Sequence, residues 1–347
     1  MKAAISDGSR ILYFQARNLG DAVIGTRLVE TFGRSFPRSP ITVFTRPELA
    51  DIYRHNPHVD ELRFAAFPVG SAKNTGIGEV RRLWCELGRI RRQRYDLVVN
   101  CEGGLGENVL AWLMSPRHNS GPIWSIDHPR NSFFRTGLGG LIRYPVTVPV
   151  DVPDVYSAMD ELARGLGAMR PAKSRLYASG GRELRCREEA EIIGIHPLAS
   201  QAGKLWAAER WRELIRILRS RGRSVVLFGA SSERERLAAL IPDPTDEMVT
   251  IETLPLLEFF EKLTEVRTLV CLDSFAAHVA AAIETPAVIL TGSGMSEVWT
   301  PPGAEVIDGG KGYPPPDGVR CGDGLASGMQ RIALAEVVAT LERLGVL

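Results

Sequence analysis

The stretch TLVCLDSFAAHVAAAIETPAVILTG, residues 268–292, decides the fold class of this chain. Its apolar run Leu269–Leu272 is typical of a short strand, and small residues at 275–283 favour a helix. Pro286 cannot continue that helix, and a second apolar run follows at 287–290. The unit has the length that a right-handed parallel crossover needs. It therefore predicts an α/β protein with a parallel sheet.

Asp273, Ser274 and His278 lie where the first of these strands ends and the helix begins. Ligands in open parallel sheets bind beyond the carboxyl ends of strands. The free backbone N–H groups of a helix start also stabilise an anion. We therefore expect a diphosphate group to dock here. Two simpler explanations remain open, because Asp and Ser also cap helices and a histidine in a helix can simply pack.

The composition is that of an ordinary globular protein, with 44% hydrophobic and 24% charged residues. A length of 347 residues predicts two domains. The formal net charge of +1 gives no general electrostatic case for binding nucleic acid. Arginine is locally dense over Arg81–Arg94, at helical spacing. That spacing favours a solvated helix face, with an acidic membrane or glycolipid surface as the second interpretation.

The five cysteines are widely spaced and form no Cys-x-x-Cys pair. This pattern indicates reduced thiols in a cytosolic protein. No apolar run approaches the roughly 20 residues of a membrane span, and MKAAISDGSR at the start lacks the apolar core of a signal peptide. We expect a cytoplasmic protein, or one that is peripheral at the inner membrane.

The rest of the chain alternates short apolar runs with amphipathic segments. Further strands are expected at 11–15, 41–45, 61–64, 96–100, 191–196, 223–228 and 248–251. Further helices are expected at 22–36, 47–55, 76–94, 151–167, 207–221, 233–241, 255–266 and 329–347. The pattern weakens around 168–190. The alternation of strands and helices on either side of this weak region predicts two doubly wound domains, 1–170 and 191–328, joined by a linker at 171–190.

Three segments have no clear element pattern or an uncertain place in the fold. Residues 121–143 are expected to be irregular and to face a cleft between the domains. Residues 292–328 hold 10 glycines and 5 prolines, which indicates loops. The C-terminal helix at 329–347 is expected to return to the first domain.

Three stretches form a set in the chain. The first is Asn18-Leu19-Gly20-Asp21, between a strand and a helix. The second is His196-Pro197, followed by Lys204-Leu205-Trp206 and Glu209-Arg210-Trp211. The third is Asp273-Ser274-x-x-x-His278, followed by Thr285-Pro286, Gly292 and Trp299-x-Pro301. In this order and spacing they resemble glycosyltransferase family 9, the ADP-heptose:lipopolysaccharide heptosyltransferases, over about residues 11–302.

The resemblance implies a GT-B fold, in which two Rossmann-like domains face a central cleft. It also implies inverting transfer of a sugar from an ADP-sugar to a glycolipid or other glycan acceptor, without a metal or cofactor. The residues agree on the metal, because no Asp-x-Asp pair that would hold a metal–diphosphate occurs in the sequence. Protein cations and backbone dipoles must then neutralise the leaving group.

The resemblance assigns catalytic roles to Asp21 and Lys204. Inverting transfer needs a base for the acceptor hydroxyl proton, and the family's proposed base corresponds to Asp21. Lys204 is the cation that would meet the ADP leaving group as its charge develops. From the residues alone, a helix cap is the favoured role for Asp21. A solvated surface residue is the alternative for Lys204, but its place in the loop right after a strand disfavours it.

The remaining candidate residues divide between donor and acceptor. The donor side comprises Ser200, Gln201, Gly229, Asp273, Ser274 and His278. The acceptor side comprises Asn18, Gly20, Glu102 and Gly103. Because a carboxylate repels a diphosphate, Asp273 is expected to bind sugar hydroxyls or to orient Lys204. Trp206 and Trp211 are expected in the core rather than stacked on a ligand.

The sequence departs from the family pattern at several points. Phe275 stands where members usually have Gly, the loop 197–203 is small and apolar, and 309–325 is rich in proline. These departures leave the donor sugar open. The acceptor is also open, with the lipopolysaccharide core as the default and a capsule, a small metabolite or a protein as alternatives.

Two other functions fit the same fold: a sugar-nucleotide epimerase, which needs no acceptor, and a non-catalytic sugar-nucleotide-binding protein. An NAD-dependent dehydrogenase is disfavoured, because no G-x-G-x-x-G follows a strand.

Overall fold

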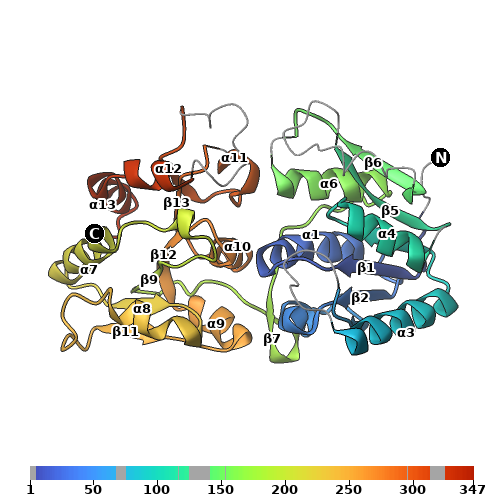
Figure 1. The fold of residues 1–347 in the computed structure, drawn as a ribbon, viewed down its shortest axis with the longest axis horizontal. Coiled ribbons are helices and arrows are strands. Elements are labelled where there is room, and N and C mark those ends of the chain that lie inside the picture. The colour runs from blue at the N-terminus through green and yellow to red at the C-terminus, as the bar shows by residue number, and fades with distance from the viewer. Residues whose placement is uncertain are drawn as a thin grey trace. The chain divides into compact units, whose positions relative to one another are not determined.

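The computed structural model describes residues 5–67, 76–115, 117–124, 141–152, 154–294, 296–312 and 325–347. The chain divides into two compact units, Met1–Arg182 and Glu183–Leu347. Each unit is built on one six-stranded parallel sheet (Figure 1). The two are described separately below.

The sheet of the first unit has the strand order β3-β2-β1-β4-β5-β6. Its strands are β1 (Ile11–Gln15), β2 (Ile41–Thr45), β3 (Glu61–Phe64), β4 (Leu97–Asn100), β5 (Asn119–Trp124) and β6 (Tyr144–Val148). All neighbouring pairs are parallel. β1, β2 and β4 are buried along their whole length, because helices cover both faces.

The helices of the first unit form two layers. They are α1 (Leu19–Ser35), α2 (Ala50–Tyr53), α3 (Ile77–Gln93), α4 (Leu105–Met114) and α6 (Val155–Gly165), with the short 3-10 helix η1 (Pro47–Leu49). α1 packs against α6. α3 and α4 pack beside each other on a core that includes Phe14 and Phe44 of the sheet.

The second unit repeats the first sheet's topology, with the order β11-β10-β9-β12-β13-β14. Its strands are β9 (Ile192–His196), β10 (Val225–Phe228), β11 (Val249–Glu252), β12 (Val266–Leu272), β13 (Ala287–Thr291) and β14 (Glu305–Asp308). Its helices are η4 (Ala202–Lys204), α7 (Ala208–Ser220), η5 (Ser231–Glu233), α8 (Arg234–Ala238), α9 (Leu256–Leu263), α10 (Phe275–Ala282), α11 (Ser296–Trp299), α12 (Leu325–Arg331) and α13 (Leu334–Arg343).

Both sheets therefore have the Rossmann strand order, in which the second and third strands lie on one side of the first strand and the fourth to sixth strands on the other. These switch points lie between β1 and β4 and between β9 and β12. Loops that leave the two strands diverge there and leave room for a ligand beyond the strand ends. The fold places the candidate residues after β1, β4, β9, β10 and β12.

Most predicted strands and helices are confirmed within a few residues. The single helix expected at 329–347 is instead two helices, the end of α12 and α13, which are separated at 332–333. Residues 121–124 belong to β5 and are not irregular, while 125–140 lie outside the described residues. α4 was not predicted. The segment 292–328 contains α11, β14 and most of α12, although it was expected to be mainly loop.

The C-terminal helix packs on the second unit, so the expected return to the first domain is wrong. Val337 and Leu341 of α13 are fully buried in the core of the second unit, together with Val346. The segment before this helix is held there too, because the indole Nε1 of Trp206 donates to the carbonyl of Ile332 at 3.0 Å. Burial of this apolar face is the reason that the helix stays with the second unit.

The chain passes from one unit to the other within the expected linker at 171–190. The linker includes a two-stranded pairing of β7 (Tyr177–Ala178) and β8 (Arg182–Glu183), separated by η3 (Ser179–Gly181). On the side of the first unit, the Tyr177 hydroxyl donates to the buried carboxylate of Glu30 at 2.9 Å. On the side of the second unit, the Cys186 N–H donates to the Ile283 carbonyl at 2.7 Å. Both ends are thus anchored to their own units.

Candidate active site

Lys204 and Asp273 form the centre of the site in the second unit. Lys204 ends η4, in the loop after β9, and Asp273 follows β12. Lys204 Nζ donates to Asp273 Oδ2 at 2.7 Å and to the Asp273 carbonyl oxygen at 3.1 Å. The side chains are only 26% and 16% exposed. Lys204 is therefore not a solvated surface residue, and its ammonium group lies at the start of α10.

Ser274 begins α10 as its N-cap residue, with an extended backbone (φ −151°, ψ 176°). Its hydroxyl oxygen is buried and has no hydrogen-bond partner among the described residues. His278, one turn into the helix, is buried with 7% exposure. The N–H groups of the first turn of a helix lack intrahelical partners. The start of α10 thus combines free backbone donors, a hydroxyl and the nearby Lys204 ammonium.

The other donor-side residues lie on the loops that follow neighbouring strands. Ser200 and Gln201 are exposed, and the Gln201 carbonyl accepts from the Lys204 N–H at 3.1 Å. Gly229 follows β10 directly, and an added Cβ there would lie 2.9 Å from Cδ1 of Leu237. A larger residue would therefore require the buried Leu237 side chain to shift. The structure brings Lys204, Asp273 and Ser274 into one cluster, while contacts of the others with a donor stay a prediction.

His196, the last residue of β9, packs against Phe275, the residue that follows Ser274. Its ring makes an edge-to-face contact with Phe275, with centroids 5.5 Å apart, and a tilted contact with Phe259. The bulky Phe275 thus packs on a histidine and fills space that a glycine would leave open. Burial lowers the pKa of His196 to about 4, although the charge of Glu233 acts in the opposite direction. His196 is therefore neutral at pH 7.

Acidification should destabilise the second unit through His196. Its folded-state pKa of about 4 lies below its ordinary value of 6.5, so its contribution is complete above pH 6.5 and is lost as pH falls towards 4. The loss at pH 4 should be about 3 kcal/mol of unfolding free energy. Urea unfolding of the intact chain and of His196→Gln at both pH values measures it, and the variant should lose less. Equal losses would contradict a buried neutral histidine.

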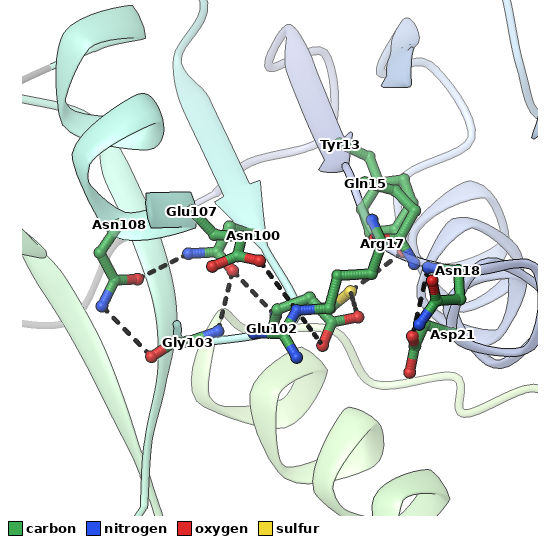
Figure 2. A network of polar contacts seen from close by, with 11 residues as sticks. Tyr13, Gln15, Arg17, Asn18, Asp21, Asn100, Glu102, Gly103, Glu107 and Asn108 are labelled. Carbon is green, nitrogen blue, oxygen red and sulfur yellow. Dashed lines mark hydrogen bonds and ion pairs between the residues drawn. The ribbon is translucent and has the colours of Figure 1, made fainter. Parts of the chain in front are cut away.

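In the first unit, Asp21 lies in the first turn of α1, three residues after the N-cap residue Asn18. Asp21 Oδ2 accepts the Asn18 N–H at 3.4 Å, which is a long hydrogen bond. Both residues are accessible, as is Gly20 between them. The capping role that the residue type suggested is therefore real but weak, and it leaves the carboxylate open for another partner (Figure 2).

Arg17 connects the loop after β1 with the loop after β4. Figure 2 shows its side chain extending towards Glu102 and Glu107. Arg17 Nε lies 2.8 Å from Glu107 Oε1 and 3.4 Å from Glu102 Oε2, and both glutamates are nearly buried. Burial alone would lower the pKa of Arg17, but the charges of Glu102, Glu107 and Asp21 raise it overall. A fixed cation thus belongs to the same charge cluster as the proposed base.

Two buried asparagines shape the turn that carries Glu102 and Gly103. The Asn100 side-chain oxygen accepts the N–H of Glu102 at 2.8 Å and that of Gly103 at 3.0 Å. Asn100 Nδ2 in turn donates to Asn108 at 2.7 Å. Gly103 has a φ of +65°, and an added Cβ would lie 2.6 Å from the carbonyl oxygen of Pro122. Glycine is therefore required at this position.

Several residues of this cluster were missed by reasoning from the sequence: Arg17, Asn100, Glu107 and Asn108. In the second unit, His196 was noted only as part of the family pattern. One signal was available. Glu107 and Asn108 are the polar residues on the inner face of the otherwise apolar α4, and polar side chains that face a core need partners. Trp206 and Trp211 are confirmed as core residues, with 3% and 1% exposure and an edge-to-face contact.

The sequence pattern of glycosyltransferase family 9 (heptosyltransferase) matches residues 80–308, about two thirds of the chain. The chain belongs to glycosyltransferase family 9. It is thus a glycosyltransferase, of EC class 2.4. The family 9 match includes the Lys204 and Asp273 stretches, whereas Asp21 precedes it.

Known proteins of family 9 are similar along most of this chain. Lipopolysaccharide heptosyltransferase 2 of Salmonella typhimurium is 29% identical over 319 residues, covering 84% of this chain and 85% of the relative. The crystal structure of a family 9 glycosyltransferase from Veillonella parvula matches with a TM-score of 0.76 at 19% identity, covering 98% of each chain. Heptosyltransferase WaaC of E. coli, solved with ADP-2-deoxy-2-fluoro heptose, matches with a TM-score of 0.70 at 17% identity, covering 96% of this chain and 99% of WaaC. These matches show that the fold is GT-B.

Proposed function

We propose that this glycosyltransferase moves a heptose, or a related sugar, from an ADP-sugar to a hydroxyl group of a lipopolysaccharide-core or other glycan acceptor. Transfer inverts the anomeric carbon and needs no divalent metal. The second unit binds the donor and the first unit binds the acceptor. The cytoplasmic location expected from the sequence is part of this proposal. Support for an ADP-heptose donor comes from the similar E. coli enzyme, which was solved with an analogue of it.

The observation that carries the proposal is the position of Lys204 at the start of α10. An ADP leaving group gains negative charge as the bond to the sugar breaks. The Lys204 ammonium, the Ser274 hydroxyl and the free N–H groups of α10 are donors suited to that charge. Asp273 holds the ammonium in place at 2.7 Å and is itself available to sugar hydroxyls. Because these donors are part of the protein, they do not have to reorganise during the reaction.

On the acceptor side, Asp21 takes the proton of the attacking hydroxyl group. General-base catalysis requires an ionised carboxylate within hydrogen-bond reach of that proton. The Arg17 cation belongs to the same charge cluster as Asp21. Glu102 and Glu107 hold Arg17 in turn, so they act by positioning it. Asn18 and Gly20 precede Asp21 in the same loop, and Gly103 belongs to the turn that carries Glu102.

The test is to incubate the intact protein with ADP-heptose, with and without a lipopolysaccharide-core oligosaccharide, and to follow ADP release and product mass. We expect a product heavier by one heptosyl unit, formed only with the acceptor and at an unchanged rate when EDTA is present. NMR of the new linkage should show inverted anomeric configuration. Epimerised or hydrolysed ADP-heptose without transfer would identify an epimerase or hydrolase instead. Donor binding without turnover of any acceptor would indicate the non-catalytic alternative.

A further inference from the structure

Helices α3 and α4 carry an unusual concentration of exposed apolar side chains. Five of the nine exposed large hydrophobic residues described belong to these two helices, namely Ile77, Val80, Trp84, Leu105 and Trp112. Ile77 is 92% exposed and Trp84 59%. We call these five residues, with the arginines beside them, the α3–α4 outer surface. α3 and α4 pack beside each other, and exposed apolar residues concentrated on neighbouring helices mark an interaction site.

The fold does not require these apolar residues. α3 already buries one row of apolar residues, Leu83, Leu87 and Ile90, against the core of the first unit. Ile77, Val80 and Trp84 follow each other at the i, i+3 and i+7 spacing that makes a second row, this one open to solvent. On α4, Leu105 and Trp112 repeat the spacing of seven and are likewise exposed. One buried row per helix is enough for folding.

The same surface carries a local excess of positive charge. α3 holds five arginines against two glutamates, a net charge of +3 on one helix of a chain whose total is +1. Its glutamates are engaged, since Glu79 accepts the Gly76 N–H and Glu86 pairs with neighbouring arginines. Arg81 and Arg91 are exposed, and their guanidinium groups make no ion pair or side-chain hydrogen bond within the described part of the chain.

We infer that the α3–α4 outer surface docks on an anionic lipid bilayer. Exposed tryptophans prefer the boundary between headgroups and acyl chains, and arginines beside them bind anionic headgroups. A second copy of the chain fits less well, because a two-fold contact would bring two helices of charge +3 together. α4 begins directly after the turn of Glu102 and Gly103, so docking would bring the proposed acceptor side close to a membrane-anchored glycan. This last step rests on the proposed function.

The test is co-sedimentation of the intact protein with vesicles of phosphatidylcholine alone or mixed with phosphatidylglycerol. Binding should require phosphatidylglycerol and should weaken as salt is added. Arg81→Gln/Arg91→Gln should lower partitioning roughly 25-fold, at about fivefold for each arginine, and Trp84→Ala should lower it several-fold. The matched controls Arg216→Gln/Arg221→Gln and Met248→Ser change exposed residues of the second unit and should bind like the unmodified protein.

Three outcomes would overturn docking. The first is no sedimentation with anionic vesicles, and the second is an equal loss of binding in the control variants. The third is self-association of the unmodified protein that Trp84→Ala abolishes, because the surface would then be an interface between copies. Transfer to a water-soluble acceptor fragment separates docking from the proposed function. The surface variants should keep that activity and their thermal stability. If the unmodified protein binds vesicles but transfers no sugar, the proposed function fails and docking stands.

Discussion

Replacement of Asp21 by Asn is expected to lower kcat for sugar transfer by about 10²- to 10⁴-fold, the usual contribution of a general base. Asn keeps the size of the side chain and an oxygen that accepts the Asn18 N–H, so α1 should still begin at the same place. What is lost is the group that takes the hydroxyl proton. Donor binding, measured by calorimetry with ADP, should not change, because Asp21 belongs to the first unit.

Glu79→Gln is the matched control for this variant. Glu79 occupies the same position in α3 and accepts the N–H of the N-cap residue Gly76 at 3.1 Å. Its replacement should leave kcat with a soluble acceptor unchanged. If Asp21→Asn retained kcat within a few-fold, Asp21 would be no more than a helix-capping residue and the base would have to be sought elsewhere. Glu102 is the next carboxylate to test.

Replacement of Lys204 by Met is expected to lower kcat by roughly 10²- to 10³-fold, as for loss of one donor to a developing oxyanion. Methionine keeps most of the aliphatic stem but removes the ammonium group. The KM for the donor should change less than kcat, because the charge on the leaving group is largest in the transition state. Steady-state kinetics with ADP-heptose and a soluble acceptor separate the two parameters.

Lys262→Met controls for the loss of a similar ion pair in the same unit. Lys262 Nζ lies 2.7 Å from Glu265 Oε2, and both side chains are 30% exposed. The Lys262→Met variant should change neither kcat nor KM.

In Lys204→Met, Asp273 keeps its charge without the ammonium group beside it and should repel the diphosphate. Lys204→Met/Asp273→Asn should therefore bind ADP more tightly than the single variant does, a non-additivity that neighbouring groups show. Additive effects would mean that the two residues act separately.

Reasoning from the sequence recovered most of the fold, and it named Lys204 and Asp273, which the structure brings together. Buried parallel strands appear as short apolar runs, so β9, β10, β12 and β13 could be located from residue type alone. Strand β6 alternates exposed and half-buried residues and gave no such run. Arg17 was not proposed because its importance comes from Glu107, a residue 90 positions away.

The sequence by itself determined that the chain forms two doubly wound α/β units, because each strand and helix has its own local apolar period. It also determined which side chains follow the strand ends. Only the tertiary structure decided that Lys204 meets Asp273 across 69 residues and that α13 stays with the second unit. The physical reason is that such contacts depend on which strands become neighbours in the sheet. That order is set by packing of the whole unit and leaves no local periodicity to read.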